Sequence, residues 1–75
     1  MITEQQLKAL GVEMKRLREV RGLTQDEVGA AVSISGAAIC RYENGTRQPE
    51  AAVLFGLEKV LHAPEYSLVK FLKPA

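Results

Sequence analysis

Apolar residues along this chain recur at helical intervals, in stretches separated by short polar or glycine-containing breaks. In the first stretch they step by three, four and three residues, which places one apolar stripe on one helix face: Leu7, Leu10, Met14 and Leu17. Thr3 and Gln6 form a capping box at the start of this helix, and Gly22 ends it. No alternation typical of a strand is present, so the pattern predicts an all-α protein.

The next two apolar stretches are short, and each has its own start signal. Thr24 and Glu27 make a second capping box, which predicts a helix from Gln25 that runs through the apolar positions Val28, Ala31 and Val32. The sequence Ser33-Ile34-Ser35 interrupts this pattern, and Ser35 is suited to cap a second helix. That helix carries Ile39 and Tyr42 on one face and ends at Gly45. Two helices joined by so short a turn cross steeply, as in a helix-turn-helix.

Two further helices are predicted. One begins near Pro49 or Glu50 and runs to His62 through its apolar positions, which are Ala51, Leu54, Leu57 and Leu61. The other follows Ala63-Pro64 and covers about residues 64 to 72, with Leu68 and Leu72 aligned at i, i+4 and Tyr66, Val69 and Phe71 left for another surface. We therefore expect one five-helix domain over residues 1–75, with its core in residues 3–62.

This order of landmarks resembles the helix-turn-helix of the phage Cro/repressor (XRE-like) DNA-binding proteins. The resemblance covers roughly residues 10 to 62. Within the two short helices it rests on Thr24-Gln25, Val28-Gly29, Ile34-Ser35 and Glu43-Asn44-Gly45, with Pro49 opening the next helix. Upstream, it rests on Leu10-Gly11, Met14, Leu17-Arg18 and Gly22-Leu23. It implies a lambda-repressor-like fold with the helix-turn-helix at the second and third helices.

The resemblance also implies roles for single residues. It pairs Arg18 with Glu43 as a structural ion pair, and it assigns phosphate contacts to Gln25, Asn44, Thr46 and Arg47. Base readout falls to the first half of the third helix, here Ser35, Gly36 and Ala37, with Arg41 one turn further on. Many relatives carry hydrogen-bonding side chains where this chain has Gly36-Ala37-Ala38, so readout depends on few side chains and on DNA shape.

Composition limits the possible functions and the cellular compartment of the protein. The net charge of +1 does not by itself indicate a nucleic-acid partner. With one histidine and one cysteine the chain cannot supply a metal site, and nothing supports a catalytic pair of Cys40 and His62, so we expect no enzyme activity, metal or cofactor. Whether Cys40 is a tolerated small residue or a redox-active thiol stays open. No stretch is apolar enough to span a membrane and no secretory signal is present, which favours a cytoplasmic protein.

The sequence thus predicts a DNA-binding transcriptional regulator. We expect a phage or prophage repressor of the Cro type, or an antitoxin-like autorepressor, that binds a palindromic double-stranded DNA operator. A homodimer joined through about residues 54–72 would supply two recognition helices. The alternative is a protein-interaction module that uses Gly36-Ala37-Ala38 as a docking surface. A toxin or other protein partner is left open.

Overall fold

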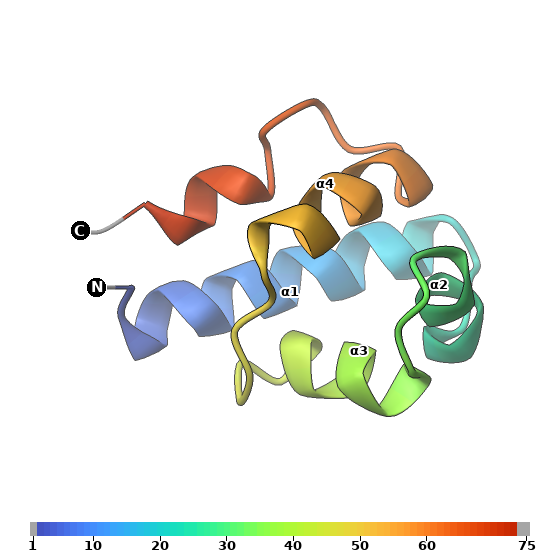
Figure 1. Ribbon diagram of the computed structural model, residues 1–75, viewed down its shortest axis with the longest axis horizontal. Coiled ribbons are helices and arrows are strands. Elements are labelled where there is room, and N and C mark those ends of the chain that lie inside the picture. Colours follow the sequence, from blue (N-terminus) through green and yellow to red (C-terminus); the bar gives the residue numbers. More distant parts are fainter. Residues whose placement is uncertain (1, 74–75) are drawn as a thin grey trace.

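The computed structural model describes residues 2–73 and folds them into four α-helices and one short 3-10 helix, without strands (Figure 1). The elements are α1 (Glu4–Val20), α2 (Gln25–Ala31), α3 (Gly36–Glu43), α4 (Ala51–Val60) and the 3-10 helix η1 (Val69–Leu72). The long helix α1 packs against α3 and η1, and α2 packs against α3 and α4. The expectation of an all-α fold with a helix-turn-helix at α2 and α3 is therefore confirmed.

Both predicted capping boxes are present. The Oγ1 atom of Thr3 accepts from the Gln6 amide at 3.0 Å, and the Gln6 side chain accepts from the Thr3 amide at 2.6 Å. The same exchange joins Thr24 and Glu27 at 3.1 and 2.9 Å. The hydrogen bonds from Thr24 hold the pKa of the Glu27 carboxyl below its ordinary value, because they favour the charged form.

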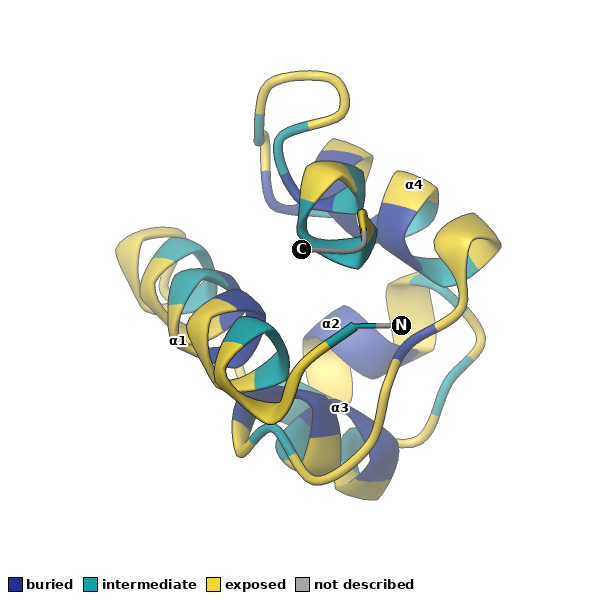
Figure 2. Cartoon of the chain, turned by 90° about the vertical axis from the view of Figure 1, so that its left-hand side faces the viewer, coloured by how far each residue is buried: buried dark blue, intermediate teal, exposed yellow. Residues whose placement is uncertain are grey.

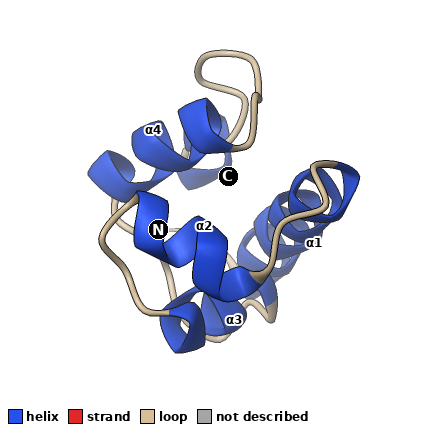
Figure 3. Cartoon of the chain, turned by 90° about the vertical axis from the view of Figure 1, so that its right-hand side faces the viewer, coloured by secondary structure: helices blue, strands red, loops and turns tan. Residues whose placement is uncertain are grey.

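The turn between α2 and α3 is tight (Figure 3). The Ile34 amide donates to the Gly29 carbonyl at 2.8 Å, and Ser33 adopts a left-handed conformation with φ of 60°. A side chain on Gly29 would overlap the carbonyl oxygen of Ile34, so the turn needs glycine there. Ser35 then caps α3, its Oγ accepting from the Ala38 amide at 3.1 Å.

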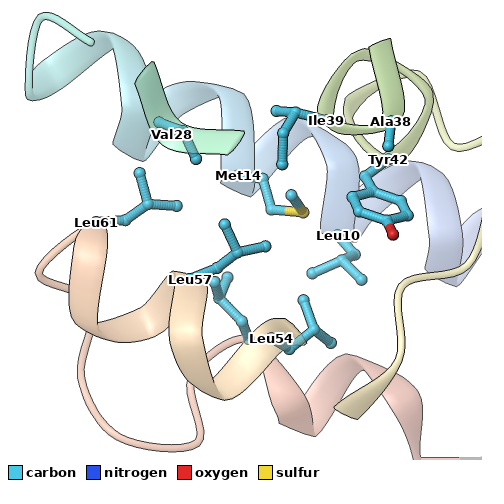
Figure 4. Close-up of a cluster of buried hydrophobic side chains, with 10 residues drawn as sticks. Leu10, Met14, Val28, Ala38, Ile39, Tyr42, Leu54, Leu57 and Leu61 are labelled. Atoms are coloured by element: carbon cyan, nitrogen blue, oxygen red, sulfur yellow. The ribbon is translucent and has the colours of Figure 1, made fainter. Parts of the chain in front are cut away.

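One hydrophobic core fills the space enclosed by the helices (Figures 2 and 4). The predicted inner face of α3 is confirmed, because Ile39 and Tyr42 are both buried. All four α-helices contribute to this core, as does the C-terminal segment, through Leu10, Met14, Val28, Ala38, Ile39, Tyr42, Leu54, Leu57, Leu61 and Leu68. Ala31, expected on the inner face of α2, is exposed.

The predicted fifth α-helix over residues 64 to 72 is wrong. Helix α4 ends at Val60, His62 lies beyond it with φ of 55°, and the chain continues as turns before η1. Tyr66 has φ of 68°, a left-handed conformation that interrupts any helix begun at Pro64. Only the short 3-10 helix at Val69–Leu72 remains of the predicted element.

A buried carboxylate holds this C-terminal segment. Glu58 of α4 is 4% exposed, and its two oxygens accept from three backbone amides: Tyr66 at 3.0 Å, Leu68 at 2.9 Å and Val69 at 3.0 Å. These amides therefore donate to the Glu58 side chain and not to backbone carbonyls of a helix. Sequence reasoning missed this residue, because a glutamate in an amphipathic helix is ordinarily a solvated one.

The anchored segment packs onto the protein's own core. Leu68 is completely buried, while Val69, Phe71 and Leu72 are half-buried against the core cluster. Val69 and Phe71 are thus not left free as the sequence suggested. Only Tyr66 of the predicted outer residues is well exposed, at 57%. The Gln6 side chain donates to the Lys73 carbonyl at 2.8 Å and ties the segment to the start of α1.

We predict that Glu58→Gln destabilises the protein by about 2–3 kcal/mol. The hydrogen bonds to a charged acceptor are lost, and at least one buried backbone amide of the C-terminal segment is left without an acceptor. The free energy of unfolding in urea measures the loss. Hydrogen exchange should accelerate at the amides of Tyr66, Leu68 and Val69 before it does so in α1. The control is Glu65→Gln, which removes the same charge from an exposed position nearby. Equal stability of the two variants would contradict the anchoring role.

Candidate nucleic-acid interface

The outer face of α3 is available to a ligand along its whole length. Ser35, Ala37 and Arg41 are exposed and Gly36 is half-buried, whereas Ala38 belongs to the core. The Ser35 oxygen accepts the Ala38 amide, which leaves its hydroxyl hydrogen free to donate. Three of the four residues predicted to read bases are therefore exposed, and Arg41 has the longest side chain among them.

A buried ion pair fixes the orientation of α3. The Nε and Nη2 atoms of Arg18 meet the two carboxylate oxygens of Glu43 at 2.7 and 3.0 Å, and Nη1 donates to the Leu23 carbonyl at 2.9 Å. The side chains are 13% and 3% exposed. The hydrogen bonds from Glu43 raise the pKa of Arg18 above its ordinary value. This is the pairing that the resemblance implies, in a bidentate geometry.

Gln25 joins this ion pair instead of standing free. Its Nε2 atom donates to Oε1 of Glu43 at 3.0 Å, and the residue is half-buried. The sequence assigned this side chain to DNA phosphate alone. Because an amide nitrogen carries two hydrogens, one donor remains for a phosphate after the bond to Glu43 is made. Gln25 thus links the start of α2 to the end of α3.

The loop after α3 is shaped by its own hydrogen bonds. Gly45 has φ of 72°, and both the amide and the hydroxyl of Thr46 donate to the Arg41 carbonyl, at 3.0 and 3.2 Å. The Thr46 hydroxyl is therefore used in ending the helix, which the sequence did not indicate. The exposed guanidinium of Arg47 lies 5.7 Å from the centre of the buried Tyr42 ring, a cation–π contact.

Asn44 and Cys40 lie one helical turn apart. The Asn44 amide donates weakly to the Cys40 sulfur at 3.5 Å, and Asn44 is otherwise exposed. Cys40 is half-buried. Asn44, Thr46 and Arg47 thus stand together beyond α3, and the first and last of them present free donors.

Two arginines near the end of α1 are engaged within the protein. Arg18 lies in the buried pair, and Arg16 makes a bidentate contact with Glu13 at 2.7 and 2.8 Å. The contact with Arg16 lowers the pKa of Glu13, and the reciprocal contact raises that of Arg16. The cationic side chains near α3 that make no ion pair within residues 2–73 include Arg41 and Arg47.

Gly11 sets the distance between α1 and α3. A methyl group at this position would lie 2.6 Å from the Tyr42 carbonyl oxygen and would overlap that of Glu43. The absence of a side chain lets the two helices approach closely where the ion pair forms. The sequence signal for Gly11 was its place among the residues that carry the resemblance.

Two kinds of feature are absent from the described residues: a metal-ligand cluster and a membrane-spanning helix. Within residues 2–73 no three histidine, cysteine or acidic side chains group where they could hold a metal ion. No helix in that range is long and apolar enough to cross a membrane.

A steeply crossed helix pair with an accessible second helix defines a helix-turn-helix protein, and comparison with known proteins agrees. The family described as "Helix-turn-helix domain" matches residues 9–66. A protein of Sinorhizobium fredii (strain NBRC 101917 / NGR234), the "Uncharacterized HTH-type transcriptional regulator y4dJ", is 36% identical over 62 residues, which are 83% of this chain and 80% of that protein. No solved structure matches significantly. The chain belongs to the XRE-like helix-turn-helix family, whose members are DNA-binding transcriptional regulators.

We predict that Glu43→Gln lowers stability by about 3–5 kcal/mol, because Arg18 would be left without a countercharge at a site shielded from water. The midpoint of thermal unfolding reports the loss. The matched control is Glu13→Gln, which breaks a bidentate arginine contact in an exposed pair and should cost about 0–1 kcal/mol. If the midpoint of Glu43→Gln equals that of the control, the buried pair does not stabilise the fold as argued.

Proposed function

We propose that this protein is a Cro-type repressor, of phage, prophage or antitoxin-like autoregulatory kind, that binds a near-palindromic operator as a homodimer. The observation that carries the proposal is the fixed orientation of α3. Its inner face is packed into the core, its last residue is held by Arg18 and Gln25, and its outer face is exposed. A helix held in this way can enter a major groove without reorganising.

The proposed contacts divide into positioning and reading. Gln25, Asn44, Thr46 and Arg47 are proposed to bind phosphates, with the Thr46 amide and hydroxyl acting mainly to shape the loop. Ser35, Gly36, Ala37 and Arg41 are proposed to face the bases. Ala37 offers a methyl group to a thymine, and Arg41 can bind guanine through two hydrogen bonds. Phosphate contacts supply affinity, and the few base contacts supply discrimination.

Dimerisation is proposed for the surface formed by α4 and the C-terminal segment. Phe55 and Tyr66 are 40% and 57% exposed, and their rings meet edge to face with centres 5.7 Å apart. A hollow beside them is lined mainly by apolar side chains at the start of α4 and along η1, including Ala51, Val69 and Leu72. Two-fold pairing through this surface would place two α3 helices about 34 Å apart, one turn of DNA.

The alternative function is a protein-interaction module that does not read DNA sequence. It would use the smooth start of α3 as a docking surface. Because Ala38 is buried, that surface consists of Gly36 and Ala37 only, which is small for a protein contact. Gel-shift titrations at several salt concentrations separate the two functions, since phosphate contacts make DNA affinity fall steeply with salt.

We predict that Arg41→Ala and Arg47→Ala weaken DNA binding in different ways. Loss of a base contact at Arg41 should cost about 1–3 kcal/mol on the operator and little on random DNA. Loss of a phosphate contact at Arg47 should weaken binding to both DNAs alike and reduce the salt slope by about one. Equilibrium binding of both variants to operator and random duplexes measures the difference. An equal loss for Arg41→Ala on both DNAs would move that residue to the phosphate contacts.

We predict that the wild-type protein sediments as a dimer at micromolar concentration or on DNA, and that Tyr66→Glu shifts it toward monomer. A charge at the exposed aromatic contact would have to be desolvated on pairing. Val12→Glu is the control, because Val12 is 67% exposed on α1, outside the proposed surface. A wild type that remains monomeric both free and on operator DNA would contradict the dimer.

A further inference from the structure

The start of α3 offers few groups that can form hydrogen bonds with bases. Gly36 has no side chain and Ala37 has a methyl group, so recognition there needs another source of polar contacts. The neighbouring element that reaches this point is the first turn of α2. Its residue Asp26 is exposed and lies directly against Gly36.

The contact between Asp26 and Gly36 is close. A methyl group on Gly36 would lie 2.9 Å from Cγ and 3.2 Å from Cα of Asp26, and it would overlap Oδ1. The carboxylate therefore occupies the space that a side chain at position 36 would take. In the helix-turn-helix geometry that space faces the base edges, because the first residues of the recognition helix enter the major groove.

The carboxylate is not committed elsewhere in the described structure. Within residues 2–73 it forms no salt bridge with Lys or Arg and no side-chain hydrogen bond. The adjacent Glu27, in contrast, is engaged in the capping box with Thr24. A free negative charge at the mouth of a phosphate-lined groove reduces affinity unless it meets a hydrogen-bond donor.

We propose that Asp26 of α2 is a specificity-determining residue, whose carboxylate accepts a hydrogen bond from the exocyclic amino group of a cytosine at the base pair facing Gly36. This inference rests on the proposed DNA-binding function and deepens it. Because Gly36 has no side chain, the Asp26 carboxylate can reach the base edges, where it supplies the polar contact that the start of α3 lacks.

The chemistry of a carboxylate selects cytosine among the four bases. An ionised carboxylate only accepts hydrogen bonds, and cytosine presents a lone N4 amino donor in the major groove. Guanine presents two acceptors and thymine presents O4 with a methyl group, so both oppose the charge. Adenine presents its N6 donor beside the N7 acceptor, which suits an amide better than a carboxylate.

Selection of binding sites from random duplex DNA, with the full chain, tests this inference. The wild type should enrich a C·G pair at one position of each half-site. Asp26→Asn should shift that position toward A·T, because an asparagine amide pairs with both N6 and N7 of adenine. The preference for cytosine over adenine should fall by roughly five- to tenfold at that position, with the remaining positions unchanged.

The matched control is Glu27→Gln, which removes the same charge from the same helical turn and keeps a side chain able to complete the capping box. Its affinity should rise by a similar amount on all sequences, through weaker phosphate repulsion, with no change in the selected bases. A second variant, Gly36→Ala, keeps every charge and displaces the carboxylate from α3. It should weaken the cytosine preference at the same position as Asp26→Asn does.

Different outcomes would overturn the role of Asp26 and the proposed DNA-binding function. Loss of the cytosine preference in Asp26→Asn but not in Glu27→Gln supports the assignment. An unchanged selected sequence in Asp26→Asn, or a uniform change that matches Glu27→Gln, overturns the role of Asp26 while sequence-specific binding by the wild type stands. A wild type that enriches no sequence overturns the proposed function and this inference with it.

Discussion

The buried carboxylate of Glu43 holds α3 in place. It receives two hydrogen bonds from Arg18 of α1 and one from Gln25 of α2, so one side chain of α3 joins three helices. The contact is short because Gly11 lets the backbones of α1 and α3 approach. A bidentate ion pair fixes the direction of this contact as well as its distance. The exposed side of α3 is therefore held in position by an ion pair on its inner side.

The second buried carboxylate, Glu58, holds the C-terminal segment through hydrogen bonds with backbone amides. Glu58 forms no salt bridge within the described residues; its carboxylate instead accepts hydrogen bonds from three amides of the C-terminal segment. Backbone amides that converge on one carboxylate can stabilise its charge as a cation would. These amides and the left-handed Tyr66 prevent a regular fifth helix. The segment covers the core with turns and a single 3-10 helix.

The sequence predicted most of the features that depend on neighbouring residues. Both capping boxes, the Ser35 cap and the left-handed Gly45 are local, and residues three or four apart identify them. The interactions it missed join distant segments: Glu58 with residues 66–69, and Gln25 with Glu43. The pair Arg18–Glu43 is also distant, and only the family resemblance indicated it. Hydrophobic periodicity predicts which residues are buried, but it does not predict which polar groups form hydrogen bonds in the interior.

The crossing of α2 and α3 shows how packing constrains what such a protein can read. Two glycines mark where these helices meet. A side chain on Gly29 would overlap the Ile34 carbonyl, whereas a side chain on Gly36 would require the Asp26 carboxylate to move. The Asp26 carboxylate of α2 occupies the space beside Gly36 that a side chain of α3 would otherwise take. In the proposed DNA complex, sequence discrimination is therefore a property of the helix pair, with its determinants on both helices.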